Sequence, residues 1–217
     1  MTYKLIEKDR DIKVPHGKVK DYVDTGLYQY PQKRGFLKYY SDDYLLDIDL
    51  VREFTNYDGP IRTNTTFYFT YVDIDGCAWP SQPHTDVISC LATHAIPLDN
   101  YSSARPGQYW NNVWGGSLCL YNEESIPDDY KEIVPKLNVE NPKQKDIDSW
   151  NDLKTWGIGP DIEYEMYLTD DESVLFTRDT WHGVGDVQIT GLLSEVAYRR
   201  ILIVNYHKED MKCAFGD

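Results

Sequence analysis

The amino-acid sequence predicts a mainly β protein with a jelly-roll or barrel architecture. Three observations support this fold class: short runs rich in aromatic and β-branched residues, turn signals between the runs, and alternation of apolar and polar residues within several of them. About eight runs are expected as strands, and closing them into a jelly-roll or barrel protects the sheet edges. At 217 residues, we expect one domain that spans 1–217 and has a hydrophobic core of its own.

The elements are expected in the following order. Residues 1–40 give no clear assignment, and Ser41, Asp42 and Asp43 can cap a helix that ends near Asn56. Strands are then expected at 66–73, 84–97 (as one or two strands), 117–121, 162–168, 174–177, 183–187 and 199–206.

Residues 123–161 interrupt this β pattern and are expected to form a helical insertion. One short helix is expected at 127–134. A second helix follows, with apolar residues at every third position, namely Ile147, Trp150, Leu153 and Trp156. The stripe indicates packing, and a lid at the mouth of a barrel is the alternative.

The composition restricts the classes of partner and compartment. The chain has 22 Lys and Arg against 36 Asp and Glu, a net charge of −14, which disfavours binding to nucleic acid. Its four cysteines show no CxxC spacing, so we expect buried thiols in a reducing compartment. Residues 1–15 lack the apolar core of a signal peptide, and no apolar stretch approaches the roughly 20 residues of a membrane span. We therefore expect a cytoplasmic protein without a membrane segment; the sequence leaves its oligomeric state open.

The tripeptide His84-Thr85-Asp86 is the main candidate for chemistry. Side chains at positions i and i+2 of an extended strand leave the same face, so His84 and Asp86 can point into one cavity. His182, from the segment Val174–Val184, can supply a second imidazole. Two imidazoles and one carboxylate suit a non-haem Fe(II) site with open coordination positions. An unpaired Asp86 inside a barrel would be costly, and a metal ion removes that cost. The remaining histidines His16, His94 and His207 are expected to be structural.

Four segments in this order give the chain a family resemblance: His84-Thr85-Asp86, Gly115-Gly116-Ser117-Leu118, Phe176 through Val184, and Arg199-Arg200-Ile201-Leu202. The pattern resembles the Fe(II)/2-oxoglutarate-dependent dioxygenases, with the prolyl-4-hydroxylase-like branch as the nearest match. The resemblance covers about residues 66–207. It implies a double-stranded β-helix (jelly-roll) core, with flanking N-terminal helices and the insertion at about 123–161.

The resemblance also implies the roles of individual residues. His84, Asp86 and His182 would ligate Fe(II), and Arg199 would bind the distal carboxylate of the cosubstrate 2-oxoglutarate. Arg suits this task because its planar donors match a carboxylate. Strand parity alone does not choose between Arg199 and Arg200, whereas the resemblance of the last strand favours Arg199. Tyr71 is a further candidate for the cosubstrate, with a core role as the alternative.

The implied activity is hydroxylation of a C–H bond with O₂, releasing succinate and CO₂. The substrate would be a peptide side chain of the prolyl type or a small metabolite. Asp86 as a ligand leaves no spare position for chloride, which favours hydroxylation over halogenation. Two alternatives stay open: a cupin-like metal enzyme that does not use 2-oxoglutarate, and a non-catalytic jelly-roll protein that binds a ligand or partner.

Overall fold

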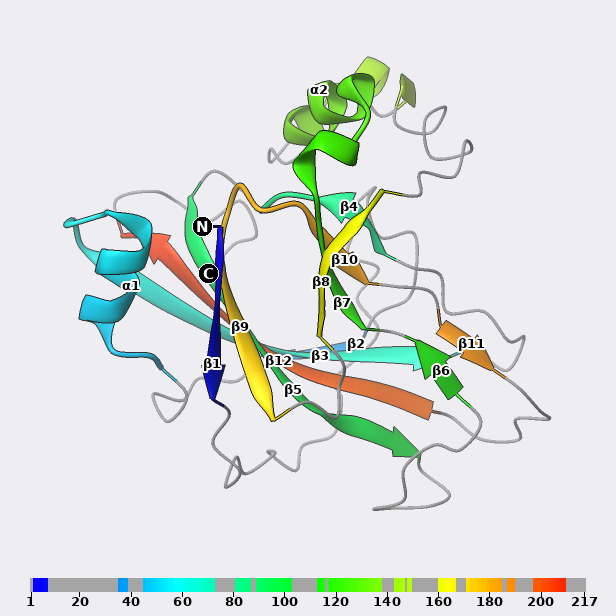
Figure 1. Ribbon diagram of the computed structural model, residues 1–217, viewed down its shortest axis with the longest axis horizontal. Helices are drawn as coiled ribbons and strands as arrows, with labels where there is room; N and C mark the ends of the chain where they lie inside the picture. The colour runs from blue at the N-terminus through cyan, green and yellow to red at the C-terminus, as the bar shows by residue number, and fades with distance from the viewer. Residues whose placement is uncertain are drawn as a thin grey trace.

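The computed structural model describes residues 2–7, 35–38, 45–72, 81–86, 89–102, 113–115, 117–137, 143–146, 148–149, 160–166, 171–184, 187–189 and 197–209. Within these ranges the chain is mainly β with few helices, which confirms the predicted fold class (Figure 1). The elements are β1 (Tyr3–Glu7), β2 (Gly35–Lys38), α1 (Ile48–Thr55), β3 (Ile61–Val72), β4 (Ser81–His84), β5 (Cys90–Ser102), β6 (Val113–Gly115), β7 (Leu118–Tyr121), the 3-10 helix η2 (Glu123–Ser125), α2 (Asp128–Leu137), β8 (Ile162–Met166), β9 (Glu172–Thr177), β10 (His182–Val184), β11 (Val187–Ile189) and β12 (Ala197–Lys208).

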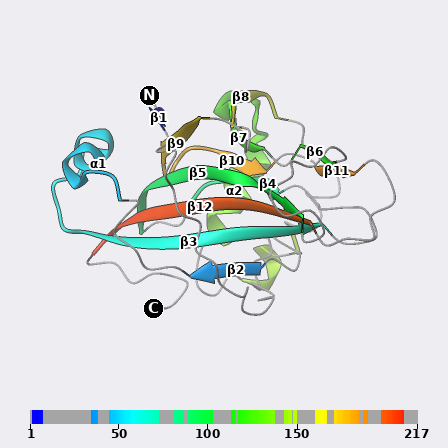
Figure 2. The same ribbon diagram turned by 90° about the horizontal axis from the view of Figure 1, so that it is seen from below.

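Two antiparallel sheets form the body of the protein. The first has six strands in the order β1-β9-β5-β12-β3-β2, and the second has four in the order β4-β10-β7-β8. Successive strands change sheets: β3 belongs to the first, β4 to the second, β5 to the first and β7 to the second. Most neighbouring strands, such as β5 and β12 or β4 and β10, are therefore distant in sequence, as in a jelly-roll. Figure 2 shows β3, β12 and β5 side by side along the first sheet.

An inner core fills the space between the two sheets. Strand alternation produces it: on β9, Val174 and Phe176 point to this core, while Leu175 between them points to the other face of the sheet. The buried residues of the inner core are Ala95, Leu118, Leu120, Met166, Val174, Phe176 and Ile201.

An outer core lies where α1 packs on the first sheet. Its buried residues are Val51, Ala92, Ile96, Leu175, Leu202, Val204 and Tyr206. The backbone N–H of Leu46 donates to the Tyr206 hydroxyl at 2.9 Å, which holds the chain just before α1 against β12. Burial raises the pKa of the Tyr206 hydroxyl to about 12, so this group stays neutral.

Helix α1 begins later than the sequence predicts. Its N-cap is Asp47, whose carboxylate accepts a hydrogen bond from Asp49 N at 3.0 Å; residues 41–43, the expected cap, lie outside the described residues. The predicted end is confirmed, because Asn56 closes the helix in the left-handed conformation at φ 50°. Helix α1 is the helix found among the described N-terminal residues; the rest of the expectation of flanking N-terminal helices falls on residues 8–34 and 39–44, which lie outside the described residues.

Several strands also differ from the prediction. Three of them are long rather than short, since β3 has 12 residues, β5 has 13 and β12 has 12. The segment predicted as one strand at 183–187 contributes to two sheets, because β10 joins the four-stranded sheet and β11 pairs with β6. β1 and β2 were not predicted at all. They extend the two edges of the first sheet by pairing with β9 and β3.

The insertion carries α2, which confirms the predicted short helix. Ile126, Tyr130, Ile133 and Val134 pack together with Trp181, so this face of the helix is a packing surface. Residues 144–146 and 148–149 are helical, but the predicted stripe residues Ile147, Trp150, Leu153 and Trp156 lie outside the described residues. None of the helices in the described ranges has the length and apolar character needed to cross a membrane.

Candidate metal centre

The two predicted histidines are cross-strand neighbours. β4 and β10 run antiparallel, and His182 lies directly opposite His84 in their register. Opposed residues of an antiparallel pair share one face and bring their Cβ atoms to about 5 Å. The two imidazole rings accordingly lie 4.3 Å apart between centroids, tilted by 51°. Both histidines are buried, each 7% exposed.

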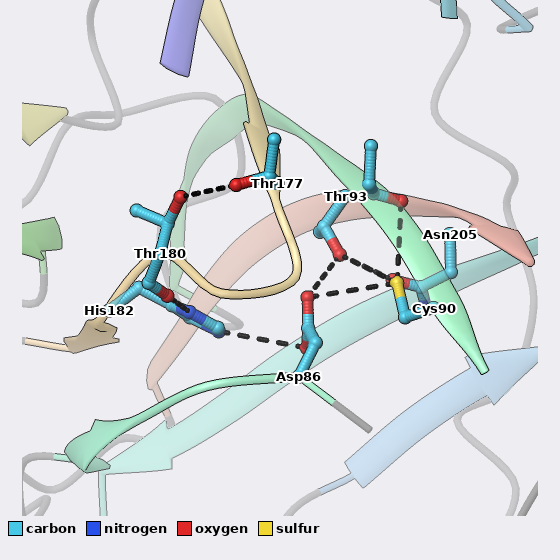
Figure 3. A network of polar contacts seen from close by, with 8 residues as sticks. Asp86, Cys90, Thr93, Thr177, Thr180, His182 and Asn205 are labelled. Atoms are coloured by element: carbon cyan, nitrogen blue, oxygen red, sulfur yellow. Dashed lines mark hydrogen bonds and ion pairs between the residues drawn. The ribbon is translucent and has the colours of Figure 1, made fainter. Parts of the chain in front are cut away.

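Asp86 joins this pair from the end of β4. Its backbone N–H donates to the carbonyl of Arg178 at 2.9 Å, which ties the His84-Thr85-Asp86 segment to the turn between β9 and β10. Its carboxylate oxygen Oδ1 lies 3.8 Å from Nε2 of His182 (Figure 3). His84 and Asp86 therefore each lie beside His182.

The hydrogen bonding of His182 leaves one ring nitrogen for a cation. Nδ1 of His182 lies 2.9 Å from the carbonyl oxygen of Thr180, an acceptor only, so Nδ1 carries the proton that is donated. In the neutral ring Nε2 then has a lone pair, and it faces another acceptor, Oδ1 of Asp86. A cation between the two atoms removes their repulsion. Such second-sphere bonding to a carbonyl is typical of metal-binding histidines.

The 3.8 Å separation fits a shared metal ion, because an ion about 2.1 Å from each donor can join atoms up to about 4.2 Å apart. In the described part of the chain, however, no three His, Cys, Asp or Glu side chains are gathered closely enough to hold a metal as they stand. Simultaneous binding by His84, Asp86 and His182 therefore requires their side chains to close in. The donor types and the free Nε2 fit the metal; the full ligand geometry is not formed.

The turn that carries His182 is fixed from two sides. The backbone carbonyl of Thr2 accepts from Thr177 N at 3.0 Å and from the Thr180 hydroxyl at 3.0 Å. On the inner side the Phe176 ring lies 4.7 Å from the His182 ring, centroid to centroid. The imidazole is thus held in place by its hydrogen bond, its strand and an aromatic neighbour.

The structure adds polar neighbours of Asp86 that sequence reasoning missed. Thr93 Oγ1 lies 2.5 Å from Oδ2 of Asp86 and 3.0 Å from Oδ1 of Asn205, and Cys90 Sγ lies 3.8 Å from the same carboxylate oxygen (Figure 3). The sequence held no local signal for Thr93 or Asn205, because each lies on a strand that carries other polar residues. Cys90 and Cys119 are both buried and outside any disulfide, as predicted, whereas Cys77 and Cys213 lie outside the described residues.

Arg199 and Tyr71 lie on adjacent strands of the first sheet. In the register of β12 with β3, Arg199 is opposite Thr70 and Tyr71 is opposite Tyr198. Tyr71 and Arg199 are therefore not cross-strand partners. Their roles toward the cosubstrate stay predictions.

His94 is buried on the outer face of the first sheet. Its Nε2 lies 2.7 Å from the Ser173 hydroxyl, which itself donates to the Ile6 carbonyl at 3.1 Å, so Nε2 carries a proton. Nδ1 is buried without a hydrogen-bond partner in the described residues. A second proton would find no acceptor there, and burial lowers the pKa of His94 from 6.5 to about 4. The expectation of a structural histidine holds for His94; His16 lies outside the described residues.

This pKa predicts acid sensitivity. The unfolded chain binds a proton at His94 near pH 6.5 and the folded protein only near pH 4, so stability is lost as the pH falls between these values. The loss corresponds to roughly 3 kcal/mol across the interval from pH 6.5 to about 4. Urea unfolding at pH 7 and at pH 4.5 measures it. His94→Asn should show a flatter pH dependence, and an unchanged slope would contradict the assignment.

His207 is also buried, with Nδ1 3.4 Å from the Ser89 hydroxyl. Burial lowers the pKa of His207, and the positive charge of Arg62 lowers it further. Like His94, it was expected to be structural, and its contact with a hydroxyl group agrees with that interpretation.

Comparison with known proteins gives a distant likeness in fold. No family model matches the chain, and no curated protein matches it. Among solved structures it is similar to "Crystal structure of IDO from Bacillus thuringiensis", with 13% sequence identity and a TM-score of 0.43, over 86% of this chain and 83% of that chain. The site described above therefore rests on the residues of this chain.

Proposed function

We propose that this protein is an Fe(II)- and 2-oxoglutarate-dependent oxygenase that hydroxylates a C–H bond. One observation carries the proposal: His84 and His182 face each other across β4 and β10, with the Asp86 carboxylate 3.8 Å from His182 Nε2. Two imidazoles and one carboxylate form the ligand set of non-haem Fe(II) oxygenases. We assign these three residues as the iron ligands.

Bound Fe(II) would supply open coordination positions at which 2-oxoglutarate and O₂ react, giving succinate, CO₂ and a hydroxylated product. The chain itself orients the ligands. Thr180 fixes the His182 ring through its carbonyl, and Phe176 shields that ring from the inner side. The burial of both histidines limits the access of water to the reacting atoms.

Strand alternation supports Arg199, rather than Arg200, as the cosubstrate residue. On β12 Ile201 belongs to the inner core and Asn205 contacts Thr93 beside Asp86, whereas Leu202 belongs to the outer core. Along β12, Arg199 shares the strand parity of Ile201 and Asn205, and Arg200 shares that of Leu202. Arg199 and Asn205 are six residues apart, about 20 Å along the strand. The Arg199 side chain and a bound 2-oxoglutarate would together have to bridge this distance to reach the metal centre beside Asn205.

The substrate class and location follow from the same proposal. A peptide side chain of the prolyl type is the first candidate, and a small metabolite is the second. The net charge of −14 disfavours nucleic acid. We propose a cytoplasmic enzyme, in agreement with the buried free thiols Cys90 and Cys119.

A matched pair of arginine variants tests the cosubstrate site. Arg199→Met should raise the KM for 2-oxoglutarate by roughly 10- to 100-fold, because a charge-assisted hydrogen bond contributes about 1.5–3 kcal/mol. Arg200→Met should leave this KM near its original value. Succinate formation under Fe(II) and O₂, followed by NMR, gives the measurement.

The other outcomes separate the alternatives. Equal KM values for both variants would overturn the role of Arg199. Binding of Fe(II) without succinate formation would favour a cupin-like metal enzyme that does not use 2-oxoglutarate. Failure to bind Fe(II) would favour a non-catalytic binding protein.

A further inference from the structure

We propose that Thr93 is a positioning residue for the Asp86 carboxylate, with Asn205 holding Thr93 in turn. The inference rests on the proposed metal centre and deepens it. It explains how a single aspartate, located after the end of a short strand, presents one defined oxygen to a metal ion.

Thr93 and Asn205 lie on two adjacent strands of the first sheet, and Asp86, which follows β4 of the second sheet, meets Thr93. Thr93 on β5 lies directly opposite Asn205 on β12 in the strand register, so both belong to the same face. Thr93 is only 3% exposed. Its hydroxyl is therefore satisfied by protein groups, and those closest to it are Asp86 Oδ2 at 2.5 Å and the Asn205 side-chain amide at 3.0 Å.

Counting protons fixes the direction of this network. Thr93 has one hydroxyl proton but lies near two oxygens, Oδ2 of Asp86 and Oδ1 of Asn205. The proton goes to the carboxylate, because a charged acceptor at the shorter distance gives the stronger bond. We therefore assign the Asn205 amide the orientation in which its oxygen and nitrogen are exchanged, so that its nitrogen donates to Thr93 Oγ1. The result is a chain of donors from Asn205 through Thr93 to Asp86, in which each bond strengthens the next.

This chain leaves the two oxygens of Asp86 with different tasks. Oδ2 is occupied by the Thr93 hydroxyl, whereas Oδ1 faces His182 Nε2 at 3.8 Å. A carboxylate held in this way offers one oxygen to a metal rather than two. Thr93 therefore favours monodentate ligation, which leaves one more coordination position free for the cosubstrate and O₂.

Cys90 is a weaker neighbour of the same oxygen. Its sulfur is 3.8 Å from Asp86 Oδ2 but 3.4 Å from the carbonyl oxygen of Ala92, and a thiol is a poor donor. The hydroxyl of Thr93 is the group that fixes the carboxylate, and the thiol fills the space beside it.

The test compares variants of the full chain for binding of Co(II). This ion replaces Fe(II) because its visible absorption spectrum reports its ligands. Thr93→Val keeps the shape of the side chain but removes the hydroxyl, and should weaken Co(II) affinity by roughly 10- to 100-fold. It should also change the visible spectrum of bound Co(II), because the ligation of Asp86 changes. Thr93→Ser keeps the hydroxyl. Its Co(II) affinity should therefore fall by less than roughly tenfold, the lower limit expected for Thr93→Val. Cys90→Ala should behave like Thr93→Ser.

Controls separate positioning from folding. Thr55→Val removes a hydroxyl that is bonded to Val51 O at 2.7 Å within α1, and should not change Co(II) affinity. If Thr93→Val does not fold, Asn205→Leu provides the test, since it removes the donor to Thr93 and should also weaken Co(II) binding. Equal affinity and an equal spectrum in Thr93→Val and the unmodified protein would overturn the inference while the metal site stands. Absence of Co(II) binding in the unmodified protein would overturn the metal site and the inference with it.

Discussion

His182→Ala is expected to lose metal binding and succinate formation. The variant removes Nε2, the ring nitrogen that faces the Asp86 carboxylate, together with Nδ1, which is bonded to the Thr180 carbonyl. Loss of a direct ligand should exceed the roughly 100-fold upper limit for loss of an outer-shell partner. Calorimetric titration with Mn(II) and NMR detection of succinate measure the two effects.

His94→Ala is the matched control for this prediction. Both variants delete a buried imidazole, since His94 is 4% exposed and His182 is 7% exposed, so both are expected to destabilise the fold. Only His182→Ala should lose the metal, because His94 lies on the outer face beside Ser173. Equal rates of succinate formation by the unmodified protein and His182→Ala would contradict the proposed mechanism.

Trp181→Ala is expected to produce the largest loss of stability. The Trp181 side chain is 5% exposed and packs against Ile126, Tyr130, Ile133 and Val134 of the insertion, with the Tyr130 ring 6.0 Å away. Truncation of a buried tryptophan costs about 3–5 kcal/mol. For a chain of this length that corresponds to a decrease of roughly 6–20 °C in Tm.

The same variant should also affect the metal centre. Trp181 immediately precedes His182, and its carbonyl accepts from Tyr121 N at 2.8 Å. We expect faster hydrogen exchange in α2 and weaker Mn(II) binding, with Trp181→Phe intermediate in both. An equal Tm for the Trp181→Ala variant and the unmodified protein would contradict the packing role of this residue.

The sequence could predict the strands of the inner core because alternation is a local property. Strand β9 is an example, since Val174 and Phe176 face the inner core and Leu175 faces α1. His84 lies on β4, but Asp86 lies two residues beyond the end of that strand, so alternation alone does not fix the position of its side chain. The opposition of His84 and His182 likewise depends on the pairing of β4 with β10, which a local pattern does not specify.

The parts that were missed depend on contacts between distant segments. β1 pairs with β9 and was unassigned, because its own residues contain no strong strand or turn signal. The start of α1 was placed too early because Ser41–Asp43 and Asp47 are both acceptable caps. Thr93 and Asn205 are separated by 112 positions, and a threonine or an asparagine within a strand is too common to indicate a network.

The pairing of β1 with β9 has a consequence for the time course of folding. Tyr3 lies opposite Phe176, so this part of the sheet forms only after more than 170 intervening residues have been made and brought back. Closing so large a loop is entropically costly and slow, and the Thr2 carbonyl supports the turn that carries His182. During synthesis on the ribosome, metal-binding competence should therefore appear late, after the sheets have formed and β1 has docked against β9.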